Sequence, residues 1–219
     1  MAALPKTESS TVVFHLNGKQ IAGAADETLL QIAKRNGVEI PHLCYKDGMR
    51  PDGNCRACMV EIKGERVLAP SCCRYPKAGM EVASDSARAT ASQKMVLELL
   101  LSDMPAESYT RDDELHDWSQ KLEVSKPRFY TRAQPKQDIS HPAIAVNLDA
   151  CIQCGRCARA CREEQMNGVI GFAGRGSHSK IVFDFDDPMG DSTCVGCGEC
   201  VQACPTGALS PGNGAALQE

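Results

Sequence analysis

Cys151-Ile152-Gln153-Cys154-Gly155-Arg156-Cys157-Ala158-Arg159-Ala160-Cys161 is the stretch that decides the fold, and its cysteine spacing recurs from Cys194. The second copy reads Cys194-Val195-Gly196-Cys197-Gly198-Glu199-Cys200-Val201-Gln202-Ala203-Cys204 and is followed by Pro205. In both copies, three cysteines separated by pairs of residues are followed by a fourth cysteine after three more residues. The repeat predicts two similar halves, each folded around a centre of the same kind.

This doubled run is the ligand pattern of a two-cluster bacterial ferredoxin, in which the fourth cysteine of each run ligates the other cluster. A zinc ribbon is the alternative, but zinc knuckles hold their metal with pairs of ligands and not with trios. We therefore expect two [4Fe–4S] clusters with crossed ligand sets. The first set is Cys151, Cys154, Cys157 and Cys204, and the second is Cys161, Cys194, Cys197 and Cys200.

An earlier group of cysteines predicts a [2Fe–2S] site, with Cys44, Cys55, Cys58 and Cys72 as its ligands. Its first gap is longer than the four-residue gap of plant-type ferredoxins. Cys73 directly follows Cys72, so the spacing alone leaves the fourth ligand ambiguous. A zinc site or a pair of regulatory thiols remains the alternative for this group.

Composition limits the classes of function. The 219 residues carry thirteen cysteines and a net charge of −4, without a block of Lys or Arg. This charge argues against nucleic acid and against an anionic membrane surface as partners. We expect no membrane span, because no window approaches 18 apolar residues. The N-terminal residues show no targeting segment, and so many cysteines without a secretion signal indicate a cytoplasmic protein and not a disulfide framework.

The order of hydrophobic patterns and turn signals predicts an α+β fold in three parts. They are a [2Fe–2S] domain over residues 1–82, a helix and linker over 83–140, and a ferredoxin-like domain with a short tail over 141–219. The first part is expected to contain two hairpins around one helix. The predicted segments are strands 11–16 and 20–22, a helix from 28 to 36, strands 59–62 and 66–68, helices 84–101 and 112–122, and strands 144–148 and 181–185.

The glycines of the cysteine runs should let backbone N–H groups approach the sulfur atoms closely. We expect Cys157 and Cys200 to end their trios, and Cys161 and Cys204 to begin the helices that lead away. No nucleotide-binding loop or nucleophile motif accompanies the cysteines, so substrate chemistry would require another centre.

In its cysteine motifs and the residues around them, the chain resembles the iron–sulfur N-terminal region of the α subunit of cytosolic NAD-dependent Mo/W formate dehydrogenases. The complex I iron–sulfur subunit and the diaphorase small subunit of NAD-reducing hydrogenases look similar too. The resemblance implies a β-grasp fold for the first domain. It also implies Cys72 as the ligand, which leaves Cys73 as an apolar filler of that domain. Its supporting stretches are Asn54–Ile62, Ala69–Cys72, Cys151–Cys154, Ser179–Gly190 and Gly207–Leu209.

Two departures from this family shape the functional expectation. Its members hold a further [4Fe–4S] cluster with one His and three Cys, but Met104 stands in place of the His and no cysteine lies between Cys73 and Cys151. We expect that cluster to be lost and Trp118 and Leu122 to fill its volume. The family also continues into a molybdopterin domain, whereas this chain ends at Glu219.

The resemblance therefore implies a non-catalytic electron-transfer subunit with one [2Fe–2S] and two [4Fe–4S] clusters. It would connect a Mo/W-pterin catalytic subunit to an FMN/NADH diaphorase subunit. The alternative is a stand-alone ferredoxin-like carrier or regulatory module.

Overall fold

The computed structural model describes residues 10–105, 107–124, 127–132 and 135–212. The chain forms two compact units. The first unit comprises Met1–His42 and Pro51–Met95, and the second comprises Leu43–Arg50 and Val96–Glu219. Most of the N-terminal segment on which the expected absence of a targeting signal rests lies outside the described residues.

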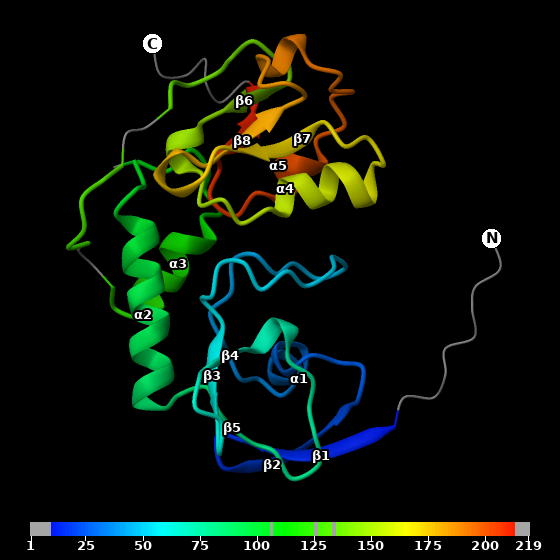
Figure 1. The fold of residues 1–219 in the computed structure, drawn as a ribbon, viewed down its shortest axis with the longest axis vertical. Helices are drawn as coiled ribbons and strands as arrows, with labels where there is room; N and C mark the ends of the chain where they lie inside the picture. The colour runs from blue at the N-terminus through cyan, green and yellow to red at the C-terminus, as the bar shows by residue number, and fades with distance from the viewer. Residues whose placement is uncertain (1–9, 106, 125–126, 133–134, 213–219) are drawn as a thin grey trace, which may run out of the picture. The chain divides into compact units, whose positions relative to one another are not determined.

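A five-stranded mixed sheet forms the framework of the first unit, in the order β2-β1-β5-β3-β4 (Figure 1). β1 and β5 are parallel, and the other neighbours are antiparallel. Helix α1 is the principal helix of this unit. The bounds are β1 Thr11–Leu16, β2 Lys19–Ala24, α1 Leu29–Arg35, β3 Met59–Ile62, β4 Ala69–Pro70 and β5 Glu81–Ala83.

Helix α1 begins at a capping box formed by Thr28 and Gln31. The Thr28 side chain accepts from the Gln31 backbone N–H, and the Gln31 side chain accepts from the Thr28 backbone N–H. Four buried side chains of α1 face the core, and the close approach of β2 depends on Gly23, where an added Cβ would lie 2.3 Å from Ile32 Cδ1. A sheet packed on one helix in this way is the expected β-grasp arrangement.

The second hairpin differs from the prediction, because the returning strand begins at Ala69 and not at Arg66. Residues 63–68 form a wide turn and bend, and β4 pairs only with Met59 and Val60. Arg88 donates to the Arg66 carbonyl at 2.6 Å. The Arg66 carbonyl therefore accepts a hydrogen bond from a side chain and not from a neighbouring strand.

The second unit contains the cysteine repeat and the two helical segments that precede it. Helix α2 is shared, since residues 87–95 group with the first unit and 96–101 with the second. Two small sheets, β6 with β9 and β7 with β8, pack around a core that includes Ile144, Ile181 and Leu209. The bounds are α2 Ala87–Leu101, α3 Glu114–Lys121, β6 Ile144–Val146, α4 Arg156–Arg159, β7 Ile170–Ala173, β8 Lys180–Phe183, α5 Glu199–Ala203 and β9 Leu209–Pro211.

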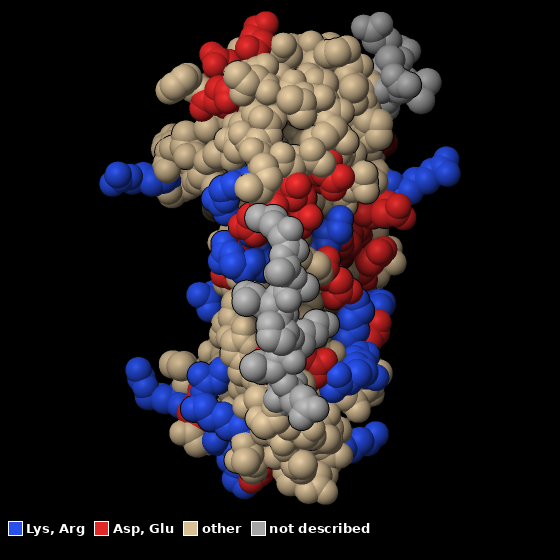
Figure 2. All heavy atoms as spheres, turned by 90° about the vertical axis from the view of Figure 1, so that its right-hand side faces the viewer, with Lys and Arg blue, Asp and Glu red and all other residues tan. Residues whose placement is uncertain are grey.

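The surface carries mixed charge. On the face shown in Figure 2, basic side chains are interspersed with acidic ones, in keeping with the net charge of −4. None of the helices in the described residues combines the length and the apolar character needed to cross a membrane.

Candidate iron–sulfur sites

Four thiols of the second unit interact as one group: those of Cys151, Cys154, Cys157 and Cys204. The charges of Cys151 and Cys204 act on the thiol of Cys154, and all three act on Cys157. The same four cysteines line one small cavity together with apolar residues such as Ile181 and Leu209. The cysteine of the second run therefore lies with the trio of the first run, as the crossed ligand set requires.

Cys200 marks a second thiol group. The largest charge effects on this thiol come from Cys194 and Cys197 of its own run and from Cys161 of the first run. The charge of Cys200 also acts on Cys157, so the two groups are neighbours. The assignment of each cysteine as a ligand stays a prediction.

The helices around the cysteines begin earlier than the sequence suggested. Cys157 lies inside α4 and Cys200 inside α5, whereas Cys204 is the residue at which α5 ends. The cause is a left-handed glycine before each helix, Gly155 with φ 75° and Gly198 with φ 81°, which turns the chain sharply into its first helical residue. Cys161 follows in a π-helical turn, Ala160–Glu164, and does not begin a helix.

The first group lies in an apolar setting, with Cys154 and Cys157 buried and Cys151 and Cys204 half-buried. Burial raises the pKa of Cys151 to about 11 and that of Cys154 to about 12, and it raises the pKa of Cys157 well above the usual value of a thiol. Because a metal takes up the thiolate, binding at this group must release protons. Backbone N–H groups of Gln153 and Arg156 oppose the effect of burial by donating to the sulfur atoms of Cys151 and Cys154.

The second group is closer to solvent. Cys197 is exposed and Cys194 is half-buried, although Cys161 and Cys200 are buried. Burial, followed by the neighbouring thiols, raises the pKa of Cys200 to about 12. The Gly196 N–H lies 3.4 Å from Cys194 Sγ and donates to it.

These features fit two polynuclear clusters. Eight thiols in two groups of four, with backbone N–H groups directed at their sulfur atoms, are the donors that [4Fe–4S] clusters need. Within the described part of the chain, no three His, Cys, Asp or Glu side chains converge on a point where a single metal ion would sit. A cubane cluster attaches each thiolate to a different iron atom and needs no such point.

The earlier cysteines divide between the two units. Cys55, Cys58 and Cys72 belong to the first unit, and Cys44 lies on the segment Leu43–Arg50, which groups with the second. Cys72 is fully buried in a 3-10 turn, Ser71–Cys73. Ser71 fixes this turn, since its hydroxyl donates to the Cys58 carbonyl at 2.8 Å.

Cys73 is exposed, so the expectation that it fills the interior of the small domain was wrong. Its sulfur lies 3.6 Å from that of Cys72, and it covers Gly53, where an added Cβ would lie 3.0 Å from Cys73 Sγ. The tight turn places one of two adjacent cysteines inside and the other outside.

The segment in which the resemblance places the lost cluster is held by a different side chain than expected. Trp118 and Leu122 are only half-buried, and Lys121 lies over the Trp118 ring at 4.8 Å from its centroid. The fully buried apolar residue of α3 is Leu115. Met104 and Leu115 line a groove of about 310 Å³, which the two predicted side chains do not line.

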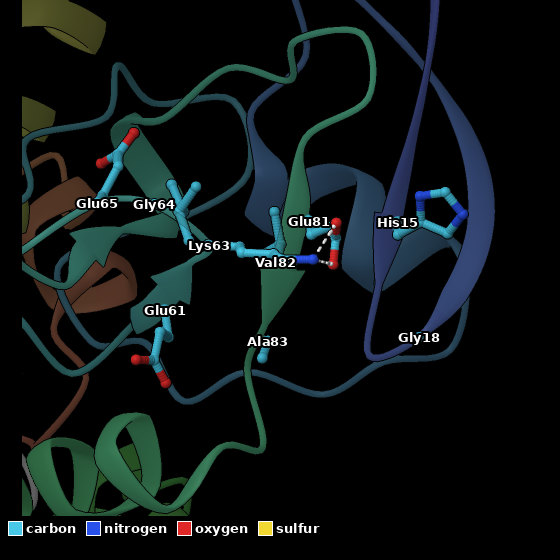
Figure 3. A pocket seen from close by; sticks show the side chains of 10 residues that line it. His15, Gly18, Glu61, Lys63, Gly64, Glu65, Glu81, Val82 and Ala83 are labelled. Atoms are coloured by element: carbon cyan, nitrogen blue, oxygen red, sulfur yellow. Dashed lines mark hydrogen bonds and ion pairs between the residues drawn. The ribbon is translucent and has the colours of Figure 1, made fainter.

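A larger groove of about 620 Å³ lies on the sheet of the first unit (Figure 3). Lys63 forms hydrogen bonds of 2.7 and 2.9 Å to Glu81 across it, and His15 and Glu61 lie further along its wall. Its lining contains no cysteine. The ion pair is exposed, and such pairs contribute little to stability.

Comparison with known families identifies two iron–sulfur domains in the chain. Residues 9–87 match the family described as 2Fe-2S iron-sulfur cluster binding domain, and residues 150–208 match the 4Fe-4S dicluster domain. The chain therefore has one [2Fe–2S] domain followed by a domain for two [4Fe–4S] clusters, and the latter contains eight cysteines.

Similar proteins belong to several oxidoreductases. The NADP-reducing hydrogenase subunit HndD of Solidesulfovibrio fructosivorans is 34% identical over 216 residues, which cover 91% of this chain and 36% of that protein. The protein of Bacillus subtilis named "Putative formate dehydrogenase YrhE" is 29% identical over 211 residues, covering 91% of this chain and 21% of that protein. This chain thus spans about a third or less of the length of these relatives.

Among solved structures, a chain from the crystal structure of an NAD+-reducing [NiFe]-hydrogenase in the H2-reduced state superposes with a TM-score of 0.84. It is 27% identical, and the match covers 92% of this chain and 88% of that one. The protein is an iron–sulfur chain with a 2Fe-2S domain and a 4Fe-4S dicluster domain, and it is a distant relative of iron–sulfur subunits of hydrogenases, NADH-ubiquinone oxidoreductases and formate dehydrogenases.

Proposed function

We propose that this chain is the electron-transfer subunit of a cytoplasmic, NAD-linked oxidoreductase. It relays electrons between a Mo/W-pterin catalytic subunit of the formate dehydrogenase type and an FMN/NADH diaphorase subunit. Iron–sulfur clusters supply one-electron chemistry when bound, and hydride or substrate chemistry belongs to flavin or metal-pterin centres.

The ligands that we propose are the twelve cysteines of the three sets. Cys44, Cys55, Cys58 and Cys72 hold the [2Fe–2S] cluster. Cys151, Cys154, Cys157 and Cys204 hold the first [4Fe–4S] cluster, and Cys161, Cys194, Cys197 and Cys200 hold the second. The observation that carries this proposal is the crossing of Cys204 and Cys161 into the opposite thiol group.

A hydrogenase is the second candidate for the parent enzyme. HndD is the most similar in sequence of the relatives described above, and the solved structure also belongs to a hydrogenase. In that case the same chain would serve a hydrogen-activating subunit in place of a metal-pterin subunit. A carrier without fixed partners is the remaining alternative.

Anaerobic affinity purification from the native host separates these possibilities. We expect the chain to copurify with a flavin-containing subunit and with a subunit that contains molybdenum or tungsten. Recovery of nickel with a hydrogenase subunit would replace the first candidate with the second. Recovery of the loaded chain alone would support the carrier, and a colourless protein containing zinc would exclude electron transfer.

A further inference from the structure

The two halves of the repeat differ in charge at one matching position. The residue between the left-handed glycine and the third cysteine is Arg156 in the first half and Glu199 in the second. Each is the first residue of its helix, α4 or α5. The same place beside the two thiol groups is therefore cationic in one half and anionic in the other.

The side chain of Arg156 is buried beside the first thiol group. It is only 3% exposed, and its guanidinium forms two hydrogen bonds to Glu114, of 2.5 and 2.8 Å. It also donates to the backbone carbonyl of Tyr45. Its buried Nε–H has no hydrogen-bond partner among the residues that the structure describes. A buried donor without a partner is costly, and a cluster sulfur is an acceptor of the kind that would satisfy it.

Cys154 is the thiol on which the Arg156 charge acts. The backbone N–H of Arg156 donates to the sulfur of Cys154, and the charge of its guanidinium acts on the same sulfur. Arg132 acts similarly on Cys151, whose backbone carbonyl accepts a hydrogen bond of 2.9 Å from it. Two guanidinium groups therefore act on the first group, and each is paired with a carboxylate, Arg156 with Glu114 and Arg132 with Asp103.

Glu114 is itself anchored to this group through α3. Its backbone N–H donates to the carbonyl of Pro205 at 2.9 Å, next to Cys204. The side chain of Asp113 caps the same helix end by accepting from His116 N at 3.1 Å. The Arg156–Glu114 pair is thus connected to both sequence segments that supply cysteines to the first group.

We propose that Arg156 raises the reduction potential of the cluster held by Cys151, Cys154, Cys157 and Cys204, and that Glu114 limits this effect. At the matching position, Glu199 lowers the potential of the second cluster. This inference rests on the proposed function, because it requires both clusters to be bound.

The physical reason is electrostatic. Reduction adds one electron to the oxidised cluster, makes its charge more negative by one, and moves no proton. A nearby cation stabilises the reduced form, and net charge and hydrogen bonds to sulfur are among the factors that set cluster potentials. Burial strengthens the interaction of Arg156, because little solvent screens it. Glu199 is half-buried, so its effect is smaller.

The test is a dithionite titration of the loaded full chain with redox mediators, followed by EPR. Cys151→Ser and Cys194→Ser first assign the two [4Fe–4S] signals. Arg156→Gln should then lower the reduction equilibrium constant of the first cluster about tenfold, a fall of about 59 mV for one electron. Arg156→Lys should retain most of the potential. Arg162→Gln is the matched control, because Arg162 also adjoins a cysteine but its side chain is 61% exposed.

Glu114→Gln provides the sharper result, because it leaves the guanidinium in place. If Arg156 sets the potential, this variant should raise the potential of the first cluster, opposite to Arg156→Gln. Glu199→Gln should raise that of the second cluster alone. If the ion pair only braces the fold, Glu114→Gln and Arg156→Gln shift the potential in the same direction or not at all, and that result overturns the inference.

Iron analysis separates this failure from failure of the proposed function. If the unmodified chain contains no clusters, the proposed function fails. If it is loaded and Glu114→Gln does not raise the potential, only the inference about Arg156 fails. Should Arg156→Gln lose the cluster, Glu114→Gln and Arg156→Lys still decide the question.

Discussion

The two halves of the cysteine repeat share a spacing but not an environment. In the first thiol group Cys154 and Cys157 are buried and Cys151 and Cys204 are half-buried, with Arg156 and Arg132 beside them. The second group exposes Cys197, and Glu199 stands at the position matching Arg156. Equal cysteine spacing therefore predicts the same kind of ligands in both halves, but it does not predict the same reduction potential for the two clusters.

The largest effect is expected from replacing the cysteine of each half that is proposed to ligate the cluster of the other half. Cys204→Ser should remove the same EPR signal as Cys151→Ser, with a loss of about four iron atoms. Cys161→Ser should likewise match Cys194→Ser. The measurement is iron content and EPR of the anaerobically reduced chain. If Cys204→Ser instead removed the signal that Cys194→Ser removes, each half would bind its own cluster and the crossed arrangement would be wrong.

A second comparison concerns two adjacent cysteines. Cys72→Ser should abolish or alter the [2Fe–2S] signal, with a loss of about two iron atoms, because Cys72 is fully buried in its turn. Cys73→Ser is the matched control and should leave the signal unchanged, since this side chain is exposed. The reverse pattern would move the ligand to Cys73.

Helix α3 is bonded through Glu114 to Arg156 of the first half and to Pro205 after the second, and its anchoring can be measured. Leu115→Ala should lower the free energy of unfolding by about 2–5 kcal/mol, because a fully buried leucine leaves a cavity. Trp118→Ala should cost less, since Trp118 is half-buried. Denaturant unfolding of the loaded chain provides both values, with iron content as the control. A larger cost at Trp118 would mean that the tryptophan fills this region after all.

The smallest expected effect is a loss of folding stability at alkaline pH, caused by Tyr109. Burial, together with the hydrogen bond of 2.7 Å to Asp149, raises the pKa of Tyr109 to about 12. A raised pKa in the folded state means that the stabilisation is complete below the unfolded value of about 10 and is lost as the pH rises to about 12. Unfolding experiments across this range should show a decline that Tyr109→Phe lacks. A parallel decline in both proteins would assign it to other groups.

Much of the framework was predictable from local chemistry. The turn at Asn17-Gly18 and the Thr28 cap specify their elements without tertiary context. The crossed ligand sets stay a prediction from the cysteine spacing. β5, β7 and β9 were missed because their segments are short, and glycines interrupt the region around β7. Tertiary contacts decide the pairing of β5 with β1 and β3, of β7 with β8, and of β9 with β6.

The surroundings of the cysteines were less accessible to sequence reasoning. Cys73 lies outside because adjacent side chains in a 3-10 turn point about 120° apart, and apolar composition cannot show this. Leu115 was overlooked because Trp118 is larger, although burial depends on the face of α3 that a residue occupies. The contrast between Arg156 and Glu199 is visible in the sequence once the halves are aligned, whereas the Glu114 partner is not.

The cluster inventory tests the central claim most directly. Iron and acid-labile sulfide should be measured on the anaerobically purified full chain, together with zinc. The account predicts about ten iron atoms and about ten sulfides per chain, with one [2Fe–2S] and two [4Fe–4S] EPR signals on reduction. About fourteen iron atoms would show that a further cluster is bound near Met104, and zinc in place of iron would contradict the account.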